Sequence, residues 1–142
     1  MNVYADSSFL TANYLSDTHS HEVDRRMATR PSLLITPFIC AELANAIYRQ
    51  VFLQRIPVFD AERAWENFDL DSRSGLLEPV EFPEASWRTI VDLAVQYGPT
   101  LGVRTLDSLH VACALELKAD KFWTFDERQA KLAEAVGLDV NP

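Results

Sequence analysis

The 142-residue sequence has only two cysteines and no hydrophobic run long enough to span a bilayer. Cys40 and Cys113 lie in apolar contexts without Cys-x-x-Cys spacing. This argues against a zinc site, and we expect both to be small core residues rather than a disulfide pair. The amino terminus has neither the basic start nor the apolar stretch of a signal peptide. These absences predict a cytoplasmic protein that does not associate with membranes.

Basic residues are also few. The 13 Lys and Arg stand against 21 Asp and Glu, which gives a formal net charge of -8 and a pI of about 4.8. Such a chain is not expected to coat nucleic acid with a generally basic surface. The balance does not exclude a nucleic-acid enzyme, because acids gathered in one cleft count toward the total and bound cations would reverse their local effect.

Apolar strand patterns alternate with helical patterns along the chain, without internal repeats, low-complexity segments or linkers. The predicted strands are residues 2–5, 33–35, 76–80 and 121–124, with a further short edge strand at 138–140. The main helical patterns begin near residues 9, 37, 60, 83, 105 and 128. With 48% hydrophobic residues, we expect a single domain over residues 1–142. The alternation predicts an α/β fold: a three-layer α/β/α sandwich with a central parallel sheet of four to five strands.

The segment from Val103 to Leu117 is the centre of the predicted site. Thr105 is the expected N-cap of a helix. An apolar stripe follows at helical spacing and comprises Leu106, Leu109, Cys113 and Leu117. Asp107 lies in the first turn, where its charge faces the positive end of the helix dipole. Taken alone, Asp107 is explained by a capping role, because Asp is common in first turns.

Three other acids change that interpretation. Asp6 follows the first strand, Glu42 lies about one and a half turns into the helix after the second strand, and Asp126 follows the strand at 121–124. In an open parallel sheet the carboxyl ends of the strands form the ligand crevice. Asp6 is equally well explained as a helix cap, and Glu42 as a side chain that reaches solvent. If the elements share one sheet edge, these acids converge with Asp107.

Converging carboxylates need a counter-charge. Two of them about 4 Å apart repel by about 4 kcal/mol at an effective dielectric of 20, which proteins relieve by raising a pKa or binding a cation. Oxygen ligands favour Mg²⁺ or Mn²⁺ over zinc or copper. One or two such ions would activate water for in-line displacement at phosphorus without a covalent nucleophile.

Further side chains are candidates for supporting roles. Ser8 and Thr124 are placed to orient a water or an Asp oxygen. Arg104 is equally well explained as a partner of a substrate phosphate or of a nearby acid. His110, three residues after Asp107, is expected to be a packing histidine, with a hydrogen bond into the site as the alternative. His19 and His21 form a His-x-His pair in a polar segment, where a solvated helix is favoured over a metal site.

The sequence resembles the PIN-domain ribonucleases, especially VapC-type toxins of toxin–antitoxin pairs, over nearly its whole length. The resemblance rests on four blocks in order: Tyr-Ala-Asp6-Ser-Ser, Glu42-Leu-Ala-Asn-Ala, Arg104-Thr-Leu-Asp107-Ser-Leu-His and Thr124-Phe-Asp126-Glu-Arg-Gln. The family's acidic quartet maps onto Asp6, Glu42, Asp107 and Asp126, and its hydroxyl positions map onto Ser8 and Thr124.

The resemblance implies a Mg²⁺- or Mn²⁺-dependent endoribonuclease on an α/β/α sandwich. It also implies a homodimer and a small antitoxin that inhibits the nuclease. Because the chain is acidic, positive charge for an RNA substrate would have to be local. The candidates are Arg25, Arg26 and Arg30, or Arg49 and Arg55.

Two other functions are consistent with the same residues. The first is a non-catalytic interaction module in which the acids bind a structural ion or a basic peptide. The second is a phosphatase or phospho-receiver with a nucleophilic Asp6. It is disfavoured because no Asp-x-Asp follows the first strand and no lysine is a convincing partner.

Overall fold

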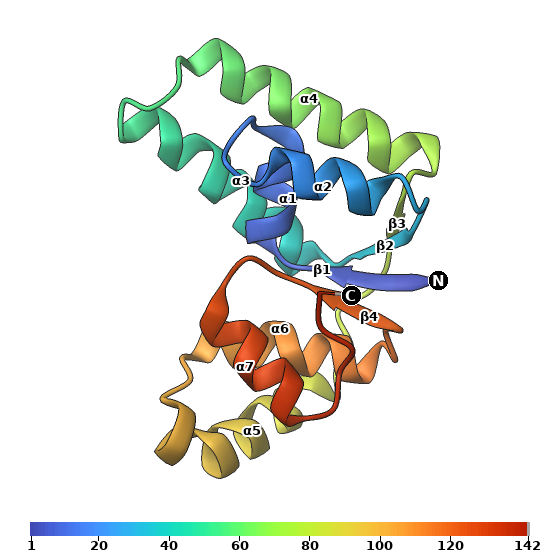
Figure 1. Ribbon diagram of the computed structural model, residues 1–142, viewed down its shortest axis with the longest axis vertical. Coiled ribbons are helices and arrows are strands. Elements are labelled where there is room, and N and C mark those ends of the chain that lie inside the picture. Colours follow the sequence, from blue (N-terminus) through green and yellow to red (C-terminus); the bar gives the residue numbers. More distant parts are fainter. Residues whose placement is uncertain (142) are drawn as a thin grey trace.

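The computed structural model describes residues 1–141 and contains a parallel sheet between two layers of helices (Figure 1). The strands are β1 (Asn2–Ala5), β2 (Ser32–Ile35), β3 (Leu77–Pro79) and β4 (Lys121–Trp123), in the spatial order β3-β2-β1-β4. All the pairings between them are parallel. This confirms the predicted sheet and its four main strands.

The edges of the sheet are shorter than the sequence predicts. The segment at 138–140 forms only an isolated bridge between Phe122 and Val140, so it is not the expected edge strand. Strand β3 ends at Pro79, whose missing N–H is tolerated at a sheet edge.

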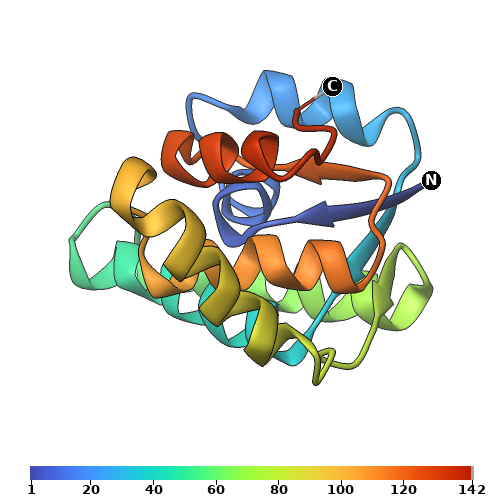
Figure 2. The same cartoon turned by 90° about the horizontal axis from the view of Figure 1, so that it is seen from below.

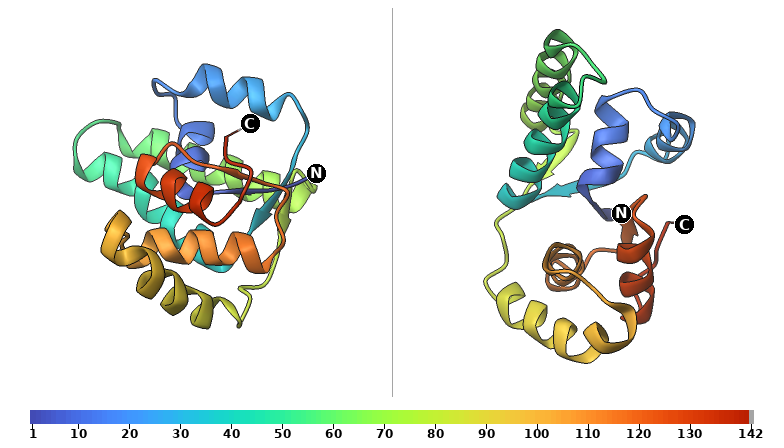
Figure 3. Two further views of the ribbon diagram at one scale, coloured as in Figure 1. Left: turned by 60° about the horizontal axis from the view of Figure 1, so that its bottom comes forward. Right: turned by 90° about the vertical axis from the view of Figure 1, so that its left-hand side faces the viewer.

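Seven helices within residues 1–141 cover the sheet: α1 (Ser7–Tyr14), α2 (Ser20–Met27), α3 (Pro37–Phe52), α4 (Val58–Ser74), α5 (Ser86–Leu101), α6 (Thr105–Glu116) and α7 (Glu127–Ala135). Figure 1 and the right-hand view of Figure 3 show α1 to α4 on one face and α5 to α7 on the other, and Figure 2 shows the molecule from the side of α5 and α6. The contacts agree, because α1 packs on α2, α3 and α4, whereas α6 packs on α5 and α7. The predicted α/β/α sandwich is therefore confirmed.

Two helix ends differ from the prediction. The sequence predicts that Gly98 and Pro99 end the helix that begins near residue 83, but α5 continues through both to Leu101, and its C-cap Gly102 has a left-handed φ of 59°. Pro99 lies in the last turns, and the backbone N–H of Gly102 still bonds the Gly98 carbonyl at 3.0 Å. The N-cap of α6 is Arg104 rather than Thr105, so Thr105 is the first helical residue.

Helix α6 is the most buried helix of its layer, since every residue from Asp107 to Ala114 is buried. Cys113 is part of this core, and Cys40 is only partly buried; neither forms a disulfide. Leu106 departs from the predicted apolar stripe, because it is 52% exposed at the start of the helix. In the described part of the chain, none of the helices has both the length and the apolarity of a membrane span.

Candidate active site

The carboxyl edge of the sheet places two of the predicted acids at the ends of neighbouring strands. Asp6 follows β1 and is the N-cap of α1, and Asp126 follows β4 and is the N-cap of α7. Because β1 and β4 are adjacent and parallel, both residues lie at the same edge. Their capping roles follow from sequence: each carboxylate accepts backbone N–H groups from the first turn of its helix.

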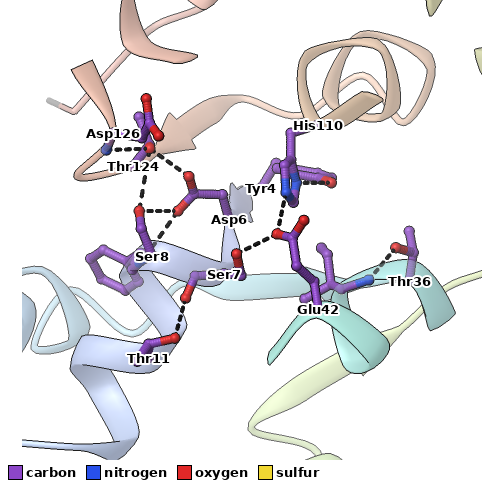
Figure 4. A network of polar contacts seen from close by, with 12 residues as sticks. Tyr4, Asp6, Ser7, Ser8, Thr11, Thr36, Glu42, His110, Thr124 and Asp126 are labelled. Carbon is purple, nitrogen blue, oxygen red and sulfur yellow. Dashed lines mark hydrogen bonds and ion pairs between the residues drawn. The ribbon is translucent and has the colours of Figure 1, made fainter. Parts of the chain in front are cut away.

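Asp6 is the most constrained of the acids, with 1% of its surface exposed. One oxygen accepts hydrogen bonds from Ser8 Oγ at 2.6 Å and from the Phe9 N–H at 3.0 Å, and the other accepts from Thr124 Oγ1 (Figure 4). Burial raises the pKa of Asp6 above its ordinary value, although the nearby His110 and these hydrogen bonds act in the opposite direction. Because burial disfavours the charged form of Asp6, a cation bound beside it would stabilise that form.

Ser8 and Thr124 connect Asp6 to the end of β4, as their positions in the sequence suggest. Ser8 Oγ also accepts the Phe125 N–H at 2.9 Å, and Thr124 Oγ1 accepts the Asp126 N–H at 2.9 Å. The two hydroxyls therefore link the carboxylate of Asp6 to the backbone N–H groups of Phe125 and Asp126.

Glu42 points back toward the sheet edge rather than only to solvent. Its Oε1 accepts a hydrogen bond from Ser7 Oγ and is 2.6 Å from His110 Nε2 (Figure 4). Burial alone would raise the pKa of Glu42, but the hydrogen bond and charge of His110, together with Ser7, lower it below its ordinary value. Glu42 is thus held as a carboxylate.

His110 is fully buried and lies between Glu42 and Tyr4, whose hydroxyl is 2.9 Å from His110 Nδ1. A carboxylate only accepts, so Nε2 carries a proton toward Glu42. Burial raises the pKa of Tyr4 well above its ordinary value, so the phenol stays protonated. His110 is therefore both a packing residue and a hydrogen-bonding neighbour of the site. Its spacing of three residues from Asp107, which places both on one face of the helix, was the reason to consider the second role from the sequence.

Asp107 also combines two roles. Its Oδ2 accepts the backbone N–H of Arg104 at 3.1 Å, which is one half of a capping box, and the residue lines the hollow that contains Asp6 and Glu42. The side chain of Arg104 is 66% exposed, and its Nε is 3.6 Å from the same oxygen. Arg104 therefore forms a long ion pair with Asp107 while most of its side chain stays exposed.

The four predicted acids line one hollow, together with Ser7, Ser8, Arg104, Leu106 and Gln129. Gln129 was not predicted. It is 6% exposed, and its Oε1 has no hydrogen-bond partner in the described part of the chain. A buried amide oxygen without a partner is rare in proteins, and it can accept from a bound water or serve as an oxygen ligand.

The donor chemistry of this hollow fits a hard cation. Hydrogen bonds among the described residues use Glu42 Oε1, Asp107 Oδ2 and Asp126 Oδ1, and each carboxylate retains its second oxygen. In their present rotamers, however, the His, Cys, Asp and Glu side chains of residues 1–141 include no group of three arranged to hold a metal ion. The backbone brings the acids to one hollow, but in these rotamers their side chains do not form a complete set of metal ligands.

The other predicted residues lie outside this hollow. Arg26 is buried, its guanidinium lies 5.7 to 5.9 Å from the rings of Phe9, Trp123 and Phe125, and it bonds Asn141 Oδ1 at 2.9 Å. Arg26 therefore cannot be a surface contact for RNA, which corrects the prediction for this residue. His21 is in α2 and belongs to no metal group of the described residues.

Several solved structures are similar to this one in fold. VapC20 of Mycobacterium tuberculosis, described as a Sarcin-Ricin loop cleaving toxin, has a TM-score of 0.72 at 14% identity and covers 96% of this chain and 95% of its own. FitAcB of Neisseria gonorrhoeae has a TM-score of 0.70 at 14% identity and covers 97% and 95%. VapBC2 of Rickettsia felis, bound to a promoter DNA fragment, has a TM-score of 0.68 at 14% identity and covers 99% and 97%.

At such low identity these similarities establish the fold only. No curated protein sequence matches the chain. The family model of the PIN domain, in contrast, matches residues 3–135, which is nearly the whole chain and includes all the acids of the hollow. The chain therefore belongs to the PIN domain family.

Proposed function

We propose that the protein is a divalent-metal-dependent endoribonuclease that acts as the toxin of a toxin–antitoxin system in the cytoplasm. The observation that carries the proposal is that Asp6, Glu42, Asp107 and Asp126 line one hollow at the carboxyl edge of a parallel sheet. Membership of the PIN domain family and the fold shared with VapC20, described as a Sarcin-Ricin loop cleaving toxin, support the same function.

In this proposal the four carboxylates hold Mg²⁺ or Mn²⁺. A cation bound there would lower the pKa of water and offset the charge that develops on the scissile phosphate. Ser8 and Thr124 fix the oxygens of Asp6, and His110 fixes Glu42. These bonds orient the ligands in advance, as the neighbours of metal ligands usually do.

The phosphatase alternative receives no support. Both oxygens of Asp6 already accept hydrogen bonds, and the side chain is almost fully buried. A nucleophilic carboxylate must approach phosphorus closely with one oxygen, which this environment hinders. Asp6 is better placed to act as a metal ligand.

The first test is the metal requirement of the wild-type protein. With MnCl₂ or MgCl₂ we expect cleavage of a single-stranded RNA, with EDTA we expect background rates, and added Mn²⁺ should restore the activity. Cleavage at full rate in EDTA would contradict the metal requirement. Calorimetric binding of Mn²⁺ without cleavage of any RNA tested would instead favour the non-catalytic module.

A homodimer and an antitoxin partner are part of the same proposal. Their support is the resemblance to VapC-type toxins and the fold shared with the VapBC2 and FitAcB structures. Light scattering of the purified protein is expected to give twice the chain mass of 16.1 kDa. Co-expression with the product of a short adjacent reading frame should give a larger complex without RNase activity. A monomer mass would contradict the dimer, and an unchanged mass and activity would contradict the partner.

A further inference from the structure

One residue joins the end of β4 to the segment that follows α7. The backbone N–H of Asn141 donates a hydrogen bond to the Phe122 carbonyl at 2.9 Å, beside the bridge between Phe122 and Val140. Asn141 has a left-handed φ of 50°, a conformation that asparagine adopts more readily than most residues. In this conformation its side chain lies next to Thr124, the residue that follows β4.

The side-chain oxygen of Asn141 accepts two hydrogen bonds. One comes from the backbone N–H of Thr124 at 2.9 Å, and the other comes from Nη1 of Arg26 at 2.9 Å. Both neighbours are donors, so the oxygen of the amide and not its nitrogen faces them. Thr124 is 1% exposed, and a buried N–H without an acceptor is strongly disfavoured. Asn141 therefore holds the backbone of Thr124 in place.

Thr124 transmits this restraint to the acids. Its hydroxyl donates to an oxygen of Asp6 and accepts the backbone N–H of Asp126 at 2.9 Å. The threonine side chain is branched at Cβ and has few rotamers, so the position of its hydroxyl follows that of its backbone. A shift of the Thr124 backbone would therefore change the positions of two acids of the hollow.

Arg26 fixes the other side of Asn141. It is 6% exposed, its Nε donates to Glu22 Oε1 at 2.7 Å, and its guanidinium lies 5.7 to 5.9 Å from the centroids of three aromatic rings. A buried cation needs such partners, and a planar guanidinium held by bonds and rings has little freedom to move. Arg26 thus anchors the amide of Asn141 to α2, and three segments distant in the sequence meet at one oxygen.

We propose that Asn141 is a positioning residue of the metal site and that Arg26 is its anchor. Neither residue lines the hollow of the four acids, so both act on it through Thr124 without touching the ion or the substrate. The proposal rests on the proposed metal-dependent nuclease and extends its site to a residue outside the four acidic blocks. It also gives a role to Arg26, whose burial excludes the RNA contact that the sequence suggested.

The central variant of the test is Asn141→Gly. Glycine adopts a φ of 50° without steric cost, so the change removes the acceptor and keeps the backbone conformation. In EDTA, NMR should show faster hydrogen exchange of the Thr124 amide and unchanged exchange in the core of α6. Calorimetry should show Mn²⁺ binding about 10- to 100-fold weaker than in the wild type. Asn141→Asp retains an oxygen at the same position and should restore both properties.

A second variant tests the anchor. Arg26→Lys keeps the charge, but an ammonium lacks the planar fork that bonds Glu22 and Asn141 together. It should weaken Mn²⁺ binding in the same direction as Asn141→Gly. The matched control is Gln54→Gly, which removes an amide side chain at another left-handed residue, with a φ of 57°, and should change neither property.

Unchanged Mn²⁺ affinity of the Asn141→Gly variant, with or without faster exchange, would overturn the positioning role. An Asn141→Asp variant that behaved like Asn141→Gly would also overturn it, because the acceptor oxygen would then not be the cause. Unchanged Mn²⁺ affinity of Arg26→Lys would refute the anchor. If the wild type bound no Mn²⁺ and cleaved no RNA, the proposed nuclease would fail, whereas exchange of the Thr124 amide would still test its contact with Asn141. The two failures are therefore separable.

Discussion

Asp6→Asn is expected to reduce metal-dependent RNA cleavage by roughly 1000-fold while the protein stays folded. Loss of one metal ligand removes several kcal/mol of transition-state stabilisation, and about 4 kcal/mol corresponds to that factor. The fold is expected to survive because the asparagine oxygen can still accept the Ser8 and Phe9 bonds that cap α1. The measurement is single-turnover cleavage with Mn²⁺, beside thermal unfolding of the same samples.

Burial and its effect on the pKa of Asp6 predict the stability of this variant. Because the buried carboxylate is disfavoured in its charged form, Asp6→Asn should unfold at the same temperature as the metal-free wild type or above it at neutral pH. Mn²⁺ should raise the unfolding temperature of the wild type and have little effect on the variant, because binding to the folded state alone is stabilising.

The matched control is Asp92→Asn, an equal change at an exposed aspartate of α5 that does not line the hollow of the four acids. It should retain wild-type cleavage and the full Mn²⁺ effect on unfolding. Normal turnover by the Asp6→Asn variant would refute the role of Asp6 as a metal ligand.

His110→Ala is expected to lower the free energy of unfolding by roughly 3 kcal/mol, a large share of the 5–15 kcal/mol typical of a domain. The change creates a cavity in the core beside α6, leaves the buried hydroxyl of Tyr4 without its partner and removes a hydrogen bond from Glu42. It should also weaken Mn²⁺ binding by about 10- to 100-fold, because His110 orients the Glu42 carboxylate. Urea denaturation and calorimetry measure the two effects.

Two other variants separate packing from orientation. Tyr4→Phe keeps the ring in the core and removes only the hydroxyl, so it should lower the stability by about 1 kcal/mol. His21→Ala changes an exposed histidine of α2 and should have an effect within about 0.5 kcal/mol. If the His110→Ala variant bound Mn²⁺ as tightly as the wild type, His110 would be a core residue without a role in orienting Glu42.

The elements around the acids show how far local patterns predict the structure. Asp6 was readable from the sequence as a helix cap at a strand end, and the structure places it there. Thr36 and Asp126, whose residue types favour the same position, are also N-caps. The end of α5 was not readable, because Gly98 and Pro99 normally terminate a helix. Its continuation to Leu101 is a property of the tertiary packing, which can override local preference.

The polar contacts of the site were less predictable. Three features depend on which neighbours other elements supply. They are the exposure of Leu106, the burial of Arg26 and the absence of a hydrogen-bond partner for the side-chain oxygen of Gln129 within residues 1–141. His110 had a visible spacing from Asp107, but its contact with Glu42 joins residues 68 positions apart. The hydrophobic period of a segment indicates which face of that helix or strand is buried. It contains no information about the side chains of the element that packs against this face.

By itself, the sequence determined the alternation of strands and helices, the family and the order of the four acidic blocks. These features depend on residues near one another in the chain, where hydrophobic period and capping preference act. Only the tertiary structure decided that Glu42 turns to His110, that Gln129 lines the hollow of the four acids, and that His19 stacks on Phe125. Those contacts form between distant segments, and their geometry is set when the sheet and its two helical layers pack together.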